Sequence, residues 1–132
     1  MLDSFLIKSE LSQLSVVQDW LKDALASEVD SSVMNNILLI TQEMVTNSIQ
    51  HGNNGDPNKE VTLNLHIDTE HVVIKIQDEG AGIKRLPNKD EAKELDYLAE
   101  NGRGLKLAVL ICHEIILNGN EVTLVFNKEA TA

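Results

Sequence analysis

The sequence contains few aromatic residues, so its core must be largely aliphatic. Phe, Trp and Tyr together make up 3% of the chain, whereas hydrophobic residues of all kinds make up 42% and charged residues 24%. These proportions are typical of a globular protein. The length of 132 residues suits one domain with its own core and is too short for two ordinary domains.

Cysteine and long apolar runs are also scarce. Cys112 is the only cysteine, so no disulfide can form within the chain, and its place in an apolar run predicts a buried structural thiol. No run approaches the roughly 18 apolar residues typical of a membrane-spanning helix. Residues 1–10 also lack the basic and apolar regions of a signal peptide. We therefore expect a cytoplasmic protein without a membrane segment.

Basic residues are outnumbered by acidic ones. Lys and Arg total 11 against 21 Asp and Glu, which gives a formal net charge of −10. A protein that binds the phosphate backbone of nucleic acids needs clustered Lys and Arg. The balance therefore excludes direct nucleic-acid binding and favours protein or small-molecule partners.

Apolar periodicity predicts most of the secondary structure. Alternating apolar residues predict strands at 2–8, 60–67, 71–78, 114–117 and 122–126. Helical spacing predicts helices at 9–26, 33–52 and 105–111. Ser9 and either Asp30 or Ser31 are the expected N-caps, and Gly52 is expected to end its helix in a left-handed conformation. Together, these helices and strands predict an α+β two-layer sandwich, with helices on one face of a mixed, mostly antiparallel sheet.

Two oxygen-bearing side chains lie one turn apart on the central helix. Glu43 and Asn47 have the i, i+4 spacing that places both side chains at the same border of the apolar face. A carboxylate and an amide so placed can serve as a general base and a Mg²⁺ ligand, because Mg²⁺ takes oxygen ligands. The alternative is a solvated polar edge of an amphipathic helix.

A carboxylate and two glycines follow the strand that ends near residue 78. Asp78 stands at the strand end, where it can accept a hydrogen bond from an amino group. Gly80 and Gly82 leave the backbone bare, so a flat ring can approach it closely. The alternative is a simple turn, since Asp and Gly are ordinary turn residues.

A second glycine pair opens the last predicted helix. Gly102 and Gly104 flank Arg103 and offer backbone N–H groups where a helix start favours phosphate. Capping of the helix by glycine is the alternative. The polar segment before this pair, about residues 84–101, contains Pro87 and is predicted to be a lid.

The order of these motifs resembles that of the GHKL (Bergerat-fold) ATPases, whose domain is also called the histidine kinase-like ATPase domain. QEMVTNSIQHG, DEGAGI and NGRGLKL look most like the anti-sigma-factor serine/threonine kinases of bacterial partner-switching systems. The resemblance covers about Leu38 to Val125, and it implies a single ATP-binding domain over residues 1–132.

The resemblance assigns roles around ATP and Mg²⁺. It implies that Glu43 polarises the attacking hydroxyl and that Asn47 binds the Mg²⁺ that bridges the phosphates. It also implies that Asp78 reads the adenine amino group. The glycines complete the site: those lining adenine would be Gly80 and Gly82, and those wrapping the phosphates Gly102 and Gly104. Arg103 is the candidate additional cation.

The resemblance also implies a function and partners. The chain would phosphorylate a serine or threonine of an anti-sigma-factor antagonist of the STAS type, with a sigma factor and a second copy of the chain as further candidate partners. Three positions depart from the pattern: Lys106 stands where relatives often carry glycine, Glu100 where some carry arginine, and His113 where many carry an acidic residue. Glu100 and Lys106 motivate an alternative, a nucleotide-gated binding module without kinase activity. A sensor-kinase catalytic domain is a third interpretation.

Overall fold

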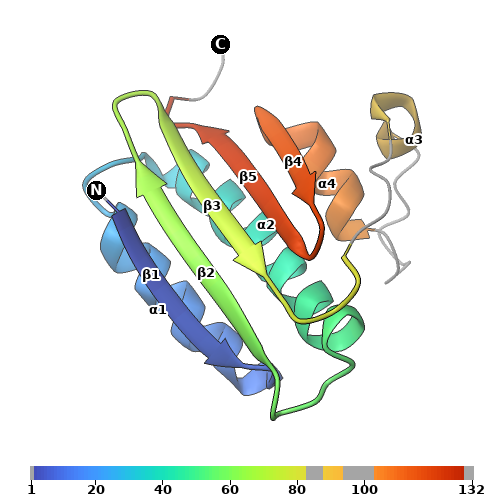
Figure 1. Cartoon of the computed structure of the whole chain (residues 1–132). Helices are drawn as coiled ribbons and strands as arrows, with labels where there is room; N and C mark the ends of the chain where they lie inside the picture. The colour runs from blue at the N-terminus through green and yellow to red at the C-terminus, as the bar shows by residue number, and fades with distance from the viewer. Residues whose placement is uncertain (1, 83–87, 94–102, 130–132) are drawn as a thin grey trace.

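A five-stranded sheet covered by helices on one face is the framework of this computed structural model (Figure 1). The structure describes residues 2–82, 88–93 and 103–129. The strands lie in the order β1 (Leu2–Lys8), β2 (Glu60–Ile67), β3 (His71–Gln77), β5 (Glu121–Asn127) and β4 (Glu114–Asn118). Every pairing between these strands is antiparallel. The predicted two-layer α+β arrangement is confirmed.

The core lies between the sheet and the helices. Side chains alternate along a strand, and in β2 and β3 the positions facing the helices are aliphatic and at most 5% exposed. Leu65 and Ile74 are cross-strand neighbours in this layer. Complete burial of one such side chain stabilises the fold by about 1.5–3 kcal/mol. The alternation that predicted the strands therefore also fixes which face the helices cover.

The first helix begins later than predicted. A 3-10 turn at Leu11–Gln13 precedes α1 (Leu14–Leu25), and no side chain caps either segment. The prediction that Ser9 is an N-cap is wrong, because its buried hydroxyl donates to the Lys59 carbonyl at 2.9 Å. The hydroxyl that the local pattern assigned to a helix cap is therefore hydrogen-bonded to a residue outside the helix.

The central helix α2 (Ser31–Asn47) starts as predicted and ends in an unusual turn. The Asp30 carboxylate accepts a hydrogen bond from the Val33 N–H at 2.9 Å, which makes Asp30 the N-cap. After Asn47 the chain widens into a π-helical turn over Ser48–Gly52. The predicted left-handed conformation falls not on Gly52 but on Asn54 and Gly55, with φ of 53° and 68°.

The last helices flank the end of the sheet formed by β4. The short helix α3 (Lys89–Lys93) precedes α4 (Arg103–Ile111), which lies beside and partly behind β4 in Figure 1. Except for residues 88–93, the predicted lid at 84–101 lies outside the described residues. Glu100 lies in the part that is not described. Cys112 follows α4 and is half-buried against the core rather than fully buried. Burial raises the pKa of its thiol to about 12.

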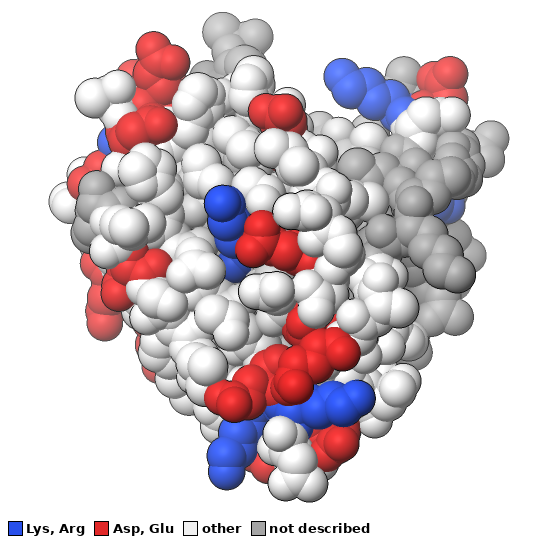
Figure 2. Space-filling view, in the orientation of Figure 1, with Lys and Arg blue, Asp and Glu red and all other residues white. Residues whose placement is uncertain are grey.

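In the part of the chain that the structure describes, the opposite face of the sheet carries no helix and little charge (Figure 1). Figure 2 looks onto this face, and most of the side chains on it are uncharged. At one end of the molecule the Lys128 ammonium donates to the Glu28 carboxylate at 2.7 Å and to the Asp68 carbonyl at 3.1 Å. These contacts join the end of β5 to the loop between α1 and α2 and to the turn between β2 and β3. In the described parts of the chain, no helix is long and apolar enough to cross a membrane.

Candidate functional site

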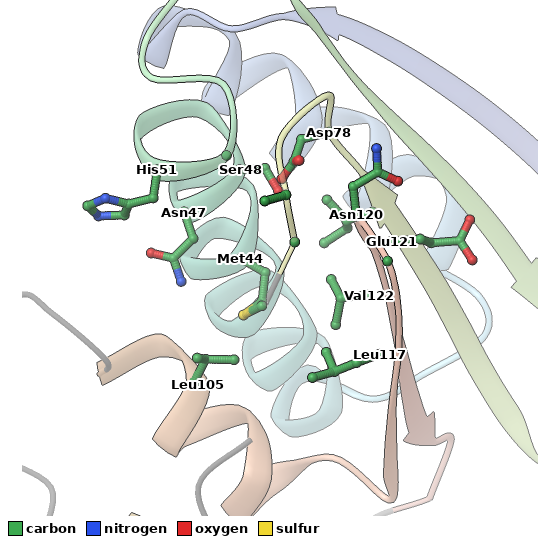
Figure 3. A pocket seen from close by; sticks show the side chains of 15 residues that line it. Met44, Asn47, Ser48, His51, Asp78, Leu105, Leu117, Asn120, Glu121 and Val122 are labelled. Carbon is green, nitrogen blue, oxygen red and sulfur yellow. The ribbon is translucent and has the colours of Figure 1, made fainter. Parts of the chain in front are cut away.

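A cavity of about 370 Å³ lies between the C-terminal part of α2 and the ends of β3, β4 and β5. Figure 3 shows Met44 and Asn47 of α2 on one side and Leu117 and Val122 of the last hairpin on the other. Most of the remaining wall comes from these residues: Ser48, His51, Gly52, Ile76, Asp78, Ala81, Gly82, Leu105, Gly119, Asn120 and Glu121. The lining combines an apolar floor with a few polar groups at the edge, as small-molecule sites do.

The predicted Glu43 and Asn47 pair meets the start of α4. A Cβ built on Gly104 would lie 2.9 Å from the Glu43 Cβ and 3.6 Å from the Asn47 Nδ2. A side chain at position 104 would therefore crowd Glu43 and come into ordinary contact with Asn47. Asn47 lines the cavity, and Glu43 is half-buried just beyond it. The structure thus brings together two motifs about sixty residues apart, in agreement with the order in which the sequence presents them.

The turn after β3 holds Asp78 at the other end of the cavity. The Asp78 N–H donates to the Asn120 carbonyl at 3.1 Å, and its carboxylate accepts from the Gly80 N–H at 2.8 Å. The same carboxylate packs directly on the Cα of Gly52, where a Cβ would overlap it. One carboxylate oxygen is therefore engaged locally, and the group as a whole is oriented into the cavity (Figure 3).

The two glycines after Asp78 have different structural roles. Gly80 does not line the cavity, because its Cα packs on the Gly52 carbonyl. Gly82 does line the cavity and has a φ of +86°, and a Cβ on it would overlap the Gly119 carbonyl. Of the pair predicted to line a ring, only Gly82 lies in the cavity wall, while Gly80 allows two loops to approach each other.

The π-helical turn brings the end of α2 against Asp78. The Asn53 N–H donates to the Ser48 carbonyl at 2.8 Å, five residues back, so the turn is wider than an α-helical one. Such turns occur frequently at functional sites. His51 is exposed and lies at the cavity rim near Asn47 (Figure 3).

The turn between β4 and β5 lines the cavity, which the sequence did not predict. Gly119 and Asn120 line the cavity, and the Asn120 side-chain oxygen accepts from the Gln77 amide at 3.0 Å. The sequence showed only a hairpin turn at this point. A contact between residues 43 apart leaves no local pattern, so no sequence signal placed this turn beside Asp78.

Part of the predicted phosphate site lies outside the described residues. Gly102 is not described, and Arg103 is described only as the first residue of α4. Among the residues that the structure does describe, no three His, Cys, Asp or Glu side chains gather as a metal-ligand set. Mg²⁺ in phosphate-transfer sites needs only one or two protein oxygens beside those of the phosphates. The Asn47 amide oxygen beside Glu43 fits that donor set.

The comparisons with known proteins agree with this geometry. The sequence model of the histidine kinase-like ATPase domain matches residues 7–126. The anti-sigma F factor of Geobacillus stearothermophilus is 33% identical over 101 residues, which are 71% of this chain and 67% of that protein. The anti-sigma F factor of Geobacillus kaustophilus is 30% identical over 118 residues, or 83% of this chain and 79% of that protein.

A solved structure shares the fold. It is the histidine kinase domain of a blue-light activated histidine kinase from Erythrobacter litoralis EL346, with a TM-score of 0.50 and 17% sequence identity. The match covers 92% of this chain but 62% of that one, so this chain spans less than two thirds of the solved domain. At that identity the likeness concerns the fold alone.

Proposed function

This chain belongs to the histidine kinase-like ATPase (GHKL) family, in its anti-sigma-factor kinase branch, and from that premise we propose that it is an ATP-Mg²⁺-dependent serine/threonine protein kinase. Its acceptor would be an antagonist protein in a partner-switching system. One observation carries the proposal: Asp78 and Asn47, from two separate motifs, line a single cavity, and Gly104 of a third motif packs beside Glu43 and Asn47. If these motifs were only a turn, a helix edge and a helix cap with unrelated roles, we would not expect them to lie this close together.

The end of the cavity at Asp78 suits adenine. Its volume of about 370 Å³ is at the lower end of the range for small-molecule sites. The apolar side chains of Met44, Ile76 and Val122 supply surface for a flat ring. In this proposal the Asp78 carboxylate accepts a hydrogen bond from the adenine amino group, and Gly82 lines the ring.

The end at Glu43 and Asn47 suits the phosphates and the acceptor hydroxyl. In this proposal the acceptor oxygen attacks the γ-phosphorus, Glu43 takes the hydroxyl proton, and the bond from that phosphorus to the bridging oxygen of ADP breaks. Mg²⁺ would neutralise charge on the phosphates, held on the protein side by Asn47. Gly102, Arg103 and Gly104 remain the proposed phosphate-wrapping segment, and residues 84–101 the proposed lid.

The partners follow from the relatives. Proteins 30–33% identical to this chain are named anti-sigma F factors. We therefore propose that a sigma factor binds this chain, and that a STAS-type antagonist is the phosphate acceptor. A homodimer and a cytoplasmic location complete the proposal.

Nucleotide binding is tested by thermal unfolding with ADP or ATP, in Mg²⁺ or in chelator, for the parent chain and Asp78→Asn. A ligand at about 100 times its dissociation constant stabilises the folded state by roughly 2.7 kcal/mol. For a domain of this size, that shift raises the melting temperature by several degrees. We expect the shift in the parent and its loss in Asp78→Asn. An unchanged melting temperature in both proteins, with the fold intact, rejects the nucleotide site.

Phosphate transfer is tested with γ-labelled ATP, Mg²⁺ and a STAS-type antagonist selected by its binding to the ADP-loaded chain. We expect label on a serine or threonine of the antagonist, and its loss in Glu43→Gln, which keeps the side-chain shape and removes the base. Glu43→Gln should still show the ADP-dependent thermal shift. If the parent binds ADP and its partner but transfers no label, the chain is a nucleotide-gated binding module instead.

A further inference from the structure

Asn53 is a fully buried polar residue at the point where three segments meet. It is 0% exposed, and it follows Gly52 directly at the end of the π-helical turn. Its amide nitrogen donates to the Ser9 hydroxyl at 2.7 Å and to the Glu60 carbonyl at 3.0 Å. Its amide oxygen accepts from the Glu79 N–H at 2.8 Å. Both polar atoms of the side chain are therefore satisfied inside the protein, as burial requires.

The bond to Glu79 acts on the residue next to Asp78. The Asp78 N–H is held by the Asn120 carbonyl, so consecutive N–H groups of this turn are fixed by two different loops. The Glu79 carboxylate also accepts from the Glu60 N–H, at 2.6 Å. The turn is thus tied on one side to the last hairpin, and on the other side to Asn53 and the start of β2.

The backbone of the same region leaves little freedom for Asp78. Its carboxylate lies on the Cα of Gly52, and Gly80 lies on the Gly52 carbonyl. Gly52 is the neighbour of Asn53 in the chain, so one short segment supplies both the surface under Asp78 and the hydrogen bond behind it. If that hydrogen bond were absent, the turn could shift away from Gly52 and carry the carboxylate with it.

We propose that Asn53 is a positioning residue for base recognition: its side chain fixes the turn at residues 78–80 so that the Asp78 carboxylate meets the amino group of adenine. The inference rests on the proposed adenine site. It assigns to Asn53 no contact with the nucleotide. It predicts that Asn53 affects which base is bound, in addition to how stable the fold is.

The experiment compares the dissociation constants of ADP and inosine diphosphate (IDP), which has a carbonyl oxygen in place of the amino group. They are measured by calorimetry, in Mg²⁺, at a temperature where each protein is fully folded. The variants are Asn53→Ala and, as the matched control, Ser9→Ala. The control removes a buried hydrogen-bond partner of Asn53 but leaves the bond to Glu79 intact. Asn53→Ser, whose hydroxyl is too short to reach the Glu79 N–H, replaces Asn53→Ala if that variant does not fold.

We expect the parent and Ser9→Ala to bind ADP roughly ten- to a hundredfold more tightly than IDP, the range for a hydrogen bond to a charged group. In the Asn53 variant we expect this ratio to fall below about threefold, because the displaced carboxylate no longer distinguishes the bases. An unchanged ratio in the Asn53 variant overturns the inference. So does an equal fall in Ser9→Ala, because general loosening would then explain the loss.

Measurements on the parent protein distinguish a failure of this inference from a failure of the proposed adenine site. If the parent itself binds ADP and IDP equally well, or binds neither, the adenine site at Asp78 fails before Asn53 is tested. If the parent discriminates and Asp78→Asn does not, the site stands. The Asn53 variants then decide the positioning role alone.

Discussion

Gly52 is a position beside the candidate site where the structure leaves no space for a side chain. A Cβ built there would overlap both oxygens and the Cγ of the Asp78 carboxylate. The backbone itself would accept alanine, because Gly52 is not among the glycines with positive φ. We therefore expect Gly52→Ala to act almost entirely through Asp78.

The expected magnitude follows from two opposing effects. Forcing a methyl group into an occupied space lowers the free energy of unfolding by about 1–3 kcal/mol. In an Asp78→Ala background the overlapping atoms are gone, and replacing glycine by alanine then stabilises by about 0.4–1 kcal/mol through the unfolded chain. The coupling energy between the two positions should therefore be roughly 1.5–4 kcal/mol.

Urea unfolding of the parent, both single variants and the double variant measures this coupling. The single Trp, Trp20, is a suitable fluorescence probe, because its ring stacks on Phe5 at a centroid distance of 5.1 Å in the native state. Gly52→Ala alone should also weaken ADP binding to the extent that Asp78→Asn does. Equal effects of Gly52→Ala in both backgrounds would refute the claim that the contact with Asp78 is what keeps this position a glycine.

Three further outcomes are expected. Gly82→Ala should lower the free energy of unfolding by about 1–3 kcal/mol in urea, because its φ of +86° and a backbone collision both oppose a side chain. At about pH 8, iodoacetamide should alkylate native Cys112 far more slowly than the urea-unfolded chain, because burial raises the thiol pKa from 9.0 to about 12; equal rates would contradict this. The hydrogen bond and charge of Lys128 lower the pKa of Glu28 below its ordinary value of 4.5. The pair therefore stabilises the fold at pH values above 4.5, and this stabilisation is lost as pH falls through the folded-state pKa. Glu28→Gln should therefore lower the melting temperature at about pH 7, and by progressively less as pH falls below 4.5, whereas Glu129→Gln should change it little at any of these pH values.

Local periodicity was enough to predict most of the fold. The alternation in 60–67 and 71–78 fixed two strands and their hairpin, and the structure pairs them as Leu65 with Ile74. The i, i+4 spacing of Glu43 and Asn47 likewise needed only helical geometry. Features of this kind depend on neighbours in the sequence, so a pattern can reveal them.

The parts that sequence reasoning missed depend on distant partners. Ser9 looked like a helix cap, but its hydroxyl bonds to Lys59 and accepts from Asn53, 44 residues away. Gly52 looked like a left-handed helix end, but its lack of a side chain makes room for Asp78. In both cases the residue type was explained by a contact that no local pattern encodes. The roles given to the site residues toward ATP and Mg²⁺ remain predictions.

The links that hold the turn at residues 78–80 also bear on how the chain folds. The hairpins β2–β3 and β4–β5 join strands close in sequence. The β1–β2 and β3–β5 pairings, like the links from Asn53 to Ser9 and from Asn120 to Gln77, join residues at least 43 positions apart. Closing long loops costs entropy before any contact offsets it, so such links form late. The cavity lies where these late links meet. Recovery of ADP binding during refolding should therefore lag behind the formation of the helices and of the two hairpins, and report completion of the sheet and of these links.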